Sequence, residues 1–231
     1  MIIEDFIMLG RTVPEASKKH GMVVCSAGYS RELRQFLRVY PLNPLERLPR
    51  WSQCRLSLRR NSEDSRQESW RLQEEQPIAV TGKAIKSDEF TALAKMASPS
   101  IAVLNEQRAS LGIIKPIAIK GRFDGMQPQE ERIPDLFGAD IGMKKRPRLL
   151  FRDADGDHDI QLRDWGSYEF LRKQPESKHY QIWSALNLDN DQYEHLLFIG
   201  NHNQHPNNCL VIGVISEKTR AQCAINFDIA A

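Results

Sequence analysis

The sequence lacks the features that mark membrane and secreted proteins. No stretch approaches the roughly 18–20 consecutive apolar residues that a membrane helix needs. The first residues, MIIEDFIMLGR, carry acids where a signal peptide carries Lys or Arg. We therefore predict neither a membrane helix nor a signal peptide. Internal repeats and low-complexity tracts are also missing, and 41% hydrophobic with 27% charged residues is ordinary for a globular protein.

Cysteine is scarce, and its spacing argues against a metal site or a disulfide framework. The four cysteines are Cys25, Cys54, Cys209 and Cys223. They lie far apart, show no CxxC spacing, and three of them sit in apolar, strand-like runs. This pattern favours buried thiols over disulfides or zinc ligands and makes the cytoplasm the expected compartment.

Sequence motifs of the common cofactor-dependent and hydrolytic enzymes are missing. The chain has no GxGxxG, GxxxxGK[ST], HExxH or GxSxG. Its Ser, Cys and His residues show no local arrangement typical of nucleophilic catalysis. We therefore predict no cofactor, no metal ligands and no catalytic residues. A protein without enzymatic activity is favoured, although the question of an activity stays open.

Charge is distributed unevenly along the chain. Residues 1–150 contain 25 Lys and Arg against 18 Asp and Glu, whereas residues 151–231 contain 7 against 12. The overall formal charge of +2 hides this asymmetry. Two halves of opposite net charge indicate two functional surfaces.

The first half reads mainly as strands. Residues 51–60 alternate, which directs Cys54, Leu56 and Leu58 toward a core. Residues 32–40 fit a helix or a strand, and their β-branched and aromatic side chains favour the strand. Two helices are expected after these strands, one over residues 87–97 with Ser87 as its N-cap and one within residues 101–111.

The second half is expected to follow a ββααββ order. Residues 124–148 are rich in Gly, Pro and charge, so they read as a loop or linker. Two hairpin-like units follow, with two helical segments between them. We predict an α+β protein with a basic β-rich module over residues 1–123, for which a small barrel is one fitting architecture. The linker over residues 124–148 and an acidic α+β module over residues 149–231 complete the predicted organisation.

The stretch FRDADGDHDIQLRDW, residues 151–165, raises the question of a metal site. Asp153, Asp155, Asp157 and Asp159 are spaced like ligands of a calcium loop. However, that loop requires glycine where this chain has His158, and it ends in glutamate where this chain has an aspartate. The spacing therefore gives only weak support for metal binding.

A hairpin explains the same stretch better. Asp155 and Gly156 are typical of a two-residue type I′ turn. Such a turn places Arg152 opposite Asp159 and Phe151 opposite Ile160, which pairs opposite charges on one face and apolar side chains on the other. We favour this hairpin over a metal site. His202 and His205, the other candidate ligands, fall in a polar segment expected to be a solvent-facing loop.

The strongest functional signal is a basic, aromatic stretch. Residues 31–60 contain eight arginines, no lysine and two glutamates, with Phe36, Tyr40 and Trp51 interleaved. Arginine matches phosphate oxygens and stacks on planar groups, and exposed aromatics beside it are typical of single-stranded nucleic-acid binding. The alternatives are a solvated basic face with core aromatics, or a surface for an acidic protein. The predicted nucleic-acid-binding residues are Arg34, Phe36, Arg38, Tyr40, Arg55, Arg59, Arg60, Lys144, Lys145 and Arg146.

The sequence thus predicts a nucleic-acid-binding protein that is part of a larger nucleoprotein assembly. DNA and RNA are both open as ligands, with single strands favoured. The acidic C-terminal half is a candidate surface for a protein partner. Two alternatives stay open: a metal-dependent nuclease that uses Asp153, Asp155, Asp157 and Asp159, and a non-enzymatic assembly subunit with an acidic protein partner.

Overall fold

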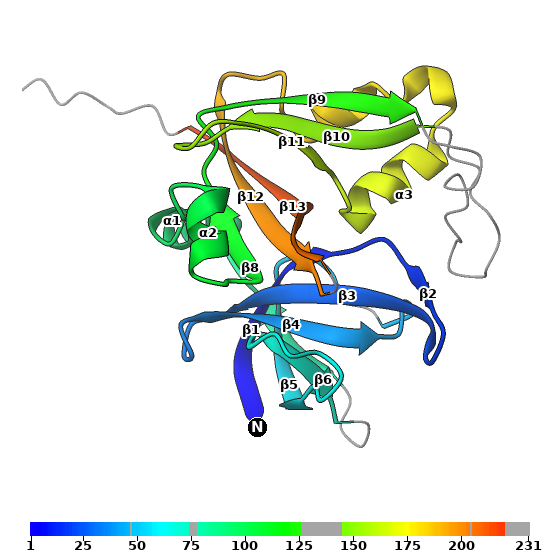
Figure 1. The fold of residues 1–231 in the computed structure, drawn as a ribbon, viewed down its shortest axis with the longest axis vertical. Helices are drawn as coiled ribbons and strands as arrows, with labels where there is room; N and C mark the ends of the chain where they lie inside the picture. The colour runs from blue at the N-terminus through cyan, green and yellow to red at the C-terminus, as the bar shows by residue number, and fades with distance from the viewer. Residues whose placement is uncertain (47, 74–77, 126–144, 204, 220–231) are drawn as a thin grey trace, which may run out of the picture.

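The protein has an N-terminal barrel followed by two three-stranded sheets and short helices (Figure 1). A computed structural model describes residues 1–46, 48–73, 78–125, 145–203 and 205–219. The first elements are β1 (Ile2–Arg11), β2 (Glu15–Ser17), β3 (Gly21–Ser30), β4 (Gln35–Leu42), β5 (Ser52–Arg60), β6 (Ser69–Leu72), β7 (Ala79–Lys83), α1 (Lys86–Lys95) and α2 (Ile101–Glu106). Those that follow are β8 (Leu111–Ile114), β9 (Ala118–Gly125), β10 (Lys145–Arg152), β11 (Asp157–Gln161), α3 (Trp165–Lys173), η1 (Glu176–Lys178), α4 (Gln181–Ala185), β12 (Tyr193–His202) and β13 (His205–Lys218).

Five strands of the first half close into a barrel. Their order is β1-β3-β4-β6-β5, and β5 pairs back to β1. The pair β4–β6 is parallel, and the other neighbouring pairs are antiparallel. This is the strand order of the five-stranded Greek-key barrel called the OB-fold. The expected β-rich N-terminal module is therefore confirmed, and the barrel is its form.

The inside of the barrel follows the alternation of the sequence. Cys54, Leu56 and Leu58 of β5 are each 0% exposed, as the pattern of residues 51–60 predicts. They pack with Phe6 and Leu37, among others, in one apolar cluster. Residues 35–42 form β4, so the strand interpretation of this ambiguous stretch is confirmed.

The outside of the barrel is covered on one side by the second half of the chain. Ile7 of β1 and Tyr29 of β3 pack with Phe198 of β12 in a second apolar cluster that also contains residues of α1 and β8. The ring of Phe36 lies 5.5 Å from Tyr29 and 5.4 Å from Phe198, measured between ring centroids. Figure 1 shows β12 and β13 between the barrel and the other sheet. Some side chains that point out of the barrel from β1, β3 and β4 therefore pack against the second half of the chain, and others face solvent.

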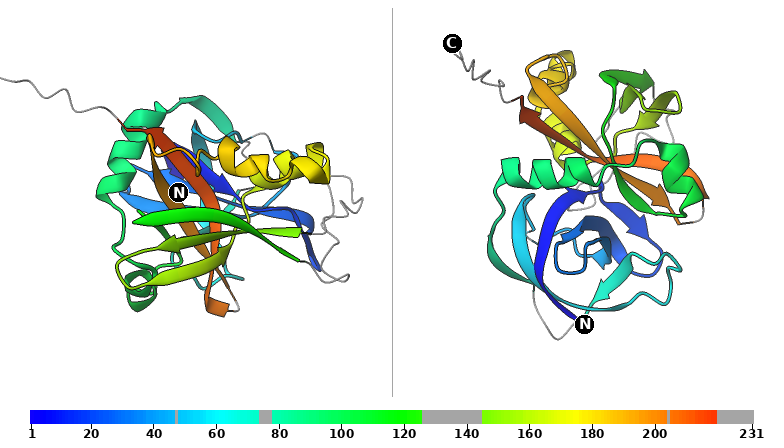
Figure 2. Two further views of the ribbon diagram at one scale, coloured as in Figure 1. Left: turned by 90° about the horizontal axis from the view of Figure 1, so that it is seen from above. Right: turned by 90° about the vertical axis from the view of Figure 1, so that its left-hand side faces the viewer.

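The second half contains the expected element order. Strands β10 and β11 precede the helices, and β12 and β13 follow them. Two earlier strands join these sheets, because β9 pairs with β10 and β8 pairs with β12. The right-hand view of Figure 2 shows the barrel below and the sheets and helices of the second half above it. The expected loop over residues 124–148 is wrong at its ends, because residues 124 and 125 belong to β9 and residues 145–148 belong to β10. Residues 126–144 lie outside the described part of the chain, and the division into modules stays a prediction.

The hairpin in the aspartate-rich stretch is present, but its predicted turn and register are wrong. Arg152 pairs with Asp157 and Phe151 with His158, two residues away from the predicted partners. The loop spans residues 153–156, and the Asp153 carboxylate accepts hydrogen bonds from the backbone N–H groups of Asp155 (2.9 Å) and Gly156 (3.3 Å). This side-chain bonding stabilises a longer loop than a type I′ turn. A shift of two residues leaves each side chain on its predicted face.

Both expected helices in the middle of the chain are present. The first begins at Lys86, and its N-cap is Ile85 without a side-chain hydrogen bond, so the prediction of Ser87 as N-cap is wrong. The second is capped by Ser100, whose hydroxyl accepts a hydrogen bond from the Val103 N–H at 3.2 Å. In the part of the chain that the structure describes, no helix is long and apolar enough to cross a membrane.

Candidate nucleic-acid interface

The predicted Arg and aromatic residues do not form one continuous exposed face. Arg38 is 2% exposed, and its guanidinium donates hydrogen bonds to the Ser110 hydroxyl and carbonyl oxygens, both at 2.8 Å. Phe36 is half-buried against β12. The expectation that both residues face solvent is wrong, because β8 and β12 cover this side of the barrel.

The remaining predicted residues are spread over several surfaces. Tyr40 is half-buried, and the arginines of β5 and of the β3–β4 turn are exposed. Several have protein partners: Arg55 pairs with Glu4 at 3.0 Å, Arg60 lies 4.0 Å over the Trp70 ring, and Lys145 pairs with Glu176 at 3.4 Å. Arg34 and Arg59 are exposed, Arg146 is half-buried, and Lys144 lies outside the described residues.

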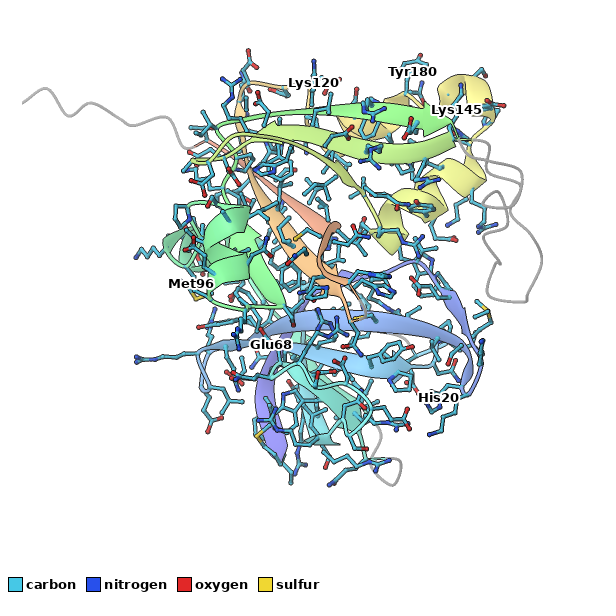
Figure 3. All side chains as sticks on the ribbon, in the orientation of Figure 1. His20, Glu68, Met96, Lys120, Lys145 and Tyr180 are labelled. Atoms are coloured by element: carbon cyan, nitrogen blue, oxygen red, sulfur yellow. The ribbon has the colours of Figure 1, made fainter. Side chains whose placement is uncertain are left out.

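A cavity of about 410 Å³ opens where the barrel meets the second half of the chain. Thr12, residues of β2, β3 and β4 and the β5–β6 loop form one side, and the tip of the β12–β13 hairpin forms the other. Figure 3 shows His20 at the barrel edge, far from Lys120 and Tyr180 on the other end of the molecule. The lining residues are Thr12, Glu15, Ser17, Lys19, His20, Val23, Cys25, Arg38, Tyr40, Asn61, Glu63, Asp64, Arg66, Gly200, Asn201, His202, Asn203, Leu210 and Ile212.

The buried Arg38 and the half-buried Cys25 lie in the wall of this cavity. Burial lowers the pKa of the Arg38 guanidinium and raises the pKa of the Cys25 thiol. Ser110, which accepts both Arg38 hydrogen bonds, itself donates from its N–H and its hydroxyl to the two Glu68 carboxylate oxygens, both at 2.9 Å. Arg38 thus bonds to the neutral oxygen atoms of Ser110, and Ser110 in turn bonds to the Glu68 carboxylate.

Basic side chains line the rim of the cavity around a single carboxylate. Glu63 pairs with Lys19, with His20 at 3.3 Å and with Arg71 at 3.6 Å. Hydrogen bonds from Lys19 and His20 hold the pKa of Glu63 below its usual range. Arg59 lies directly opposite Arg71 in the β5–β6 register. Lys19, Arg59 and Arg71, together with the His20 imidazole, therefore lie next to one another, and we call this set the basic ridge.

Arg66 joins the barrel to the β12–β13 hairpin at the cavity. Its guanidinium pairs with Asp64 at 2.5 Å and donates a hydrogen bond to the backbone oxygen of Asn201 at 2.7 Å. The Ser69 hydroxyl also donates to Asp64, at 2.7 Å. Burial alone would raise the pKa of Asp64, but the hydrogen bonds from Arg66 and Ser69 outweigh burial and lower it.

Asp64→Asn should destabilise the protein at neutral pH but not at strongly acid pH. Because the pKa of Asp64 in the folded protein lies below the unfolded value of about 3.9, its stabilisation is complete above that value. The stabilisation is lost as the pH falls through the lowered pKa. Urea denaturation across this range checks the expectation, with the exposed Asp191→Asn as control. A loss of stability that is equal at every pH would contradict it.

The carboxylates of the aspartate-rich hairpin do not converge. Asp153 is 2% exposed and pairs with the His158 Nε2 at 2.9 Å. Asp157 pairs with Arg152 at 2.7 Å, and Asp159 is bonded by two further arginines, Arg122 and Arg148. Among the described residues, no group of three or more His, Cys, Asp or Glu could hold a metal ion. These aspartates therefore do not offer the shared site that the metal-dependent nuclease hypothesis requires.

His202 and His205 are exposed, as expected, but they end β12 and begin β13 and pair with each other, so the expectation that they lie in a loop is wrong. Their rings are stacked, with centroids 5.7 Å apart. His202 also lines the cavity. The lining residues of the β2–β3 turn and of the β5–β6 loop were not predicted from the sequence. Residues 60–69, RNSEDSRQES, which contain the β5–β6 loop, read only as a polar loop.

Comparisons with known proteins find one family model that resembles part of the chain. A protein-family model described as a domain of unknown function (DUF8758) matches residues 3–98, which include the barrel strands and α1. No curated protein matches the chain. Among solved structures, a murine DNA-binding protein bound to double-stranded DNA aligns over 96% of this chain and 95% of that chain, with 8% identity and a TM-score of 0.33. A structure described as the molecular basis for abrogation of activation of pro-inflammatory cytokines aligns over 94% and 91%, with 8% identity and a TM-score of 0.31.

Proposed function

We propose that the protein binds single-stranded nucleic acid on the barrel surface around the cavity. The observation that supports this most is the position of the cavity beside the basic ridge on the outer side of β3 and β4. These are the second and third strands of the barrel. In OB-fold barrels, the face of these two strands and the adjoining loops bind oligonucleotides and oligosaccharides. The β5–β6 loop, which also lines the cavity, connects the fourth and fifth barrel strands.

The charge of the basic ridge favours a nucleic acid over an uncharged polymer. Lys19 and Arg59 are exposed and can reach phosphate oxygens at the surface. Within the described residues, Glu63 bonds Lys19, His20 and Arg71, and the basic side chains of the ridge outnumber this carboxylate. A positive track beside an aromatic side chain is the recurring arrangement for single strands, because phosphates bind the track while bases stack. Tyr40 supplies the aromatic side chain at the cavity.

The other sequence-based candidates extend this surface in the proposal. Arg34, Arg55 and Arg60 stay predicted contacts, as do Lys144, Lys145 and Arg146 in the second half. Membership of a larger nucleoprotein assembly and a protein partner for the acidic C-terminal half also stay predictions. Arg38 and Phe36 have no direct part in the proposal, since their side chains serve the contact between the barrel and β8 or β12.

The double variant Lys19→Ala, Arg59→Ala tests the ridge. Each lost phosphate contact should reduce the slope of log affinity against log salt concentration by about 0.7 for a single strand. The double variant should therefore lose up to about 1.4 units of slope and bind more weakly at low salt. Fluorescence-anisotropy titrations with a labelled oligothymidylate at several salt concentrations measure both quantities.

Arg152→Ala is the matched control. Like Arg59, Arg152 is an exposed arginine on a strand. It pairs with Asp157 and lies on β10, outside the barrel. We expect this variant to keep the wild-type slope. Wild-type protein that fails to bind single-stranded DNA or RNA at low salt would refute the proposed function. An unchanged slope in a folded double variant would move the phosphate contacts away from the basic ridge.

A further inference from the structure

We propose that the cavity binds an unpaired nucleobase, while the phosphates of the same strand stay on the basic ridge at its rim. This inference rests on the proposed function and specifies which part of the ligand enters the protein. Three features of the cavity support it: the balance of charge in its lining, its aromatic and apolar wall, and the hairpin that limits its size.

The lining is electrically balanced. The described lining residues include three carboxylates, Glu15, Glu63 and Asp64, and three cations, Lys19, Arg38 and Arg66. Each of these cations already has a protein partner, and Glu15 pairs with Arg163 at 2.6 Å. A phosphate group inside the cavity would add negative charge beside three carboxylates and would have to displace one of them. A neutral ring with hydrogen-bonding groups carries no such electrostatic cost.

The wall of the cavity suits a flat, partly apolar ligand. Tyr40 is a half-buried aromatic residue, and Val23, Leu210 and Ile212 add apolar surface. Burial raises the pKa of Tyr40, so its hydroxyl stays protonated and can act as a hydrogen-bond donor. Bases of single strands stack on aromatic side chains with little dependence on sequence. The cavity therefore offers a stacking surface, which a phosphate group could not use.

The size of the cavity and its second wall suit one base that has left its stack better than a stacked duplex. Its volume of about 410 Å³ lies near the lower end of the range of about 300–1,000 Å³ for small-molecule sites. The tip of the β12–β13 hairpin lies across it, tied to the barrel by the 2.7 Å hydrogen bond from Arg66 to the Asn201 oxygen. A base must leave its stack to enter, which is least costly in a single strand.

A cycle that combines Tyr40 variants with abasic DNA tests the inference. The probes are an oligothymidylate of about ten nucleotides, within the site size of such barrels, and an abasic strand of the same length. Tyr40→Ala should weaken binding of the oligothymidylate about 5- to 150-fold, the range that corresponds to the stacking of one base, and removal of all the bases should weaken binding at least as much. The two losses should not add, because both remove the same contact. Tyr40→Phe keeps the ring and should retain most of the affinity.

Tyr180→Ala is the matched control, since Tyr180 is 63% exposed at the other end of the molecule (Figure 3). Its affinity for both strands should equal that of the wild type. An abasic strand that binds wild-type protein as tightly as the oligothymidylate would overturn the base site and leave nucleic-acid binding intact. Additive losses, or a Tyr40→Phe variant as weak as Tyr40→Ala, would also overturn it. Failure of the wild type to bind either strand would instead refute the proposed function itself.

Discussion

Phe198→Ala should lower the free energy of unfolding by about 3–5 kcal/mol, the usual cost of removing a buried phenylalanine ring. Phe198 is 0% exposed and belongs to the apolar cluster that joins β1 and β3 to α1, β8, β12 and β13. Its ring lies 5.4 Å from that of Phe36 on the barrel. Truncation would leave a cavity between the two halves of the protein, so both halves should lose stability together.

Urea denaturation followed by circular dichroism measures this effect. Phe198→Leu fills most of the space and should cost clearly less than Phe198→Ala. Tyr180→Ala, on the surface, should change stability by no more than about 0.5 kcal/mol. A loss below about 1 kcal/mol in Phe198→Ala would contradict a tightly packed contact between the halves.

Asp164→Ala should lower the free energy of unfolding by about 3–5 kcal/mol, because it leaves a buried charge network without its acid. Asp164 is 5% exposed. One carboxylate oxygen pairs with Arg50 at 2.7 Å, and the other accepts hydrogen bonds from the Ser167 N–H at 3.0 Å and hydroxyl at 2.8 Å. Asp164 is therefore both the N-cap of α3 and the partner of an arginine that precedes β5.

Asp164→Asn separates these two roles. An asparagine still caps a helix well, so this variant should retain the cap and lose mainly the ion pair with Arg50. Its stability should lie between those of the wild type and Asp164→Ala. Asp157→Ala removes an exposed ion pair and should cost less than about 1 kcal/mol. A double-mutant cycle between Arg50→Ala and Asp164→Ala that shows no coupling would refute a contribution of the pair.

Local structure could be predicted well from the sequence where it depends only on the side-chain pattern within one strand or helix. The alternation of Cys54, Leu56 and Leu58 correctly predicted which face of β5 is buried. The order of strands and helices after residue 148 was also predictable, because each element has its own apolar period. The β4 strand was distinguished from a helix by β-branched and aromatic side chains.

Turn and cap details were less predictable, because side chains compete for the same backbone groups. Asp155 and Gly156 indicated a two-residue turn, yet the Asp153 carboxylate bonds the next backbone N–H groups and lengthens the loop. The hairpin and its two faces were right because a two-residue shift preserves side-chain direction. Ser87 resembled an N-cap, but the helix begins one residue before it.

By itself, the sequence determined the strand conformation of β4, the buried face of β5 and the basic character of the first half. Only the tertiary structure decided what covers the outer face of these strands. Arg38 and Phe36 point away from the barrel interior, but Ser110 and Phe198, more than 70 residues away in sequence, lie against them. The cavity likewise combines residues from 12 to 212. A period of two assigns a side chain to one of two faces, but whether that face meets solvent or protein depends on contacts between distant segments.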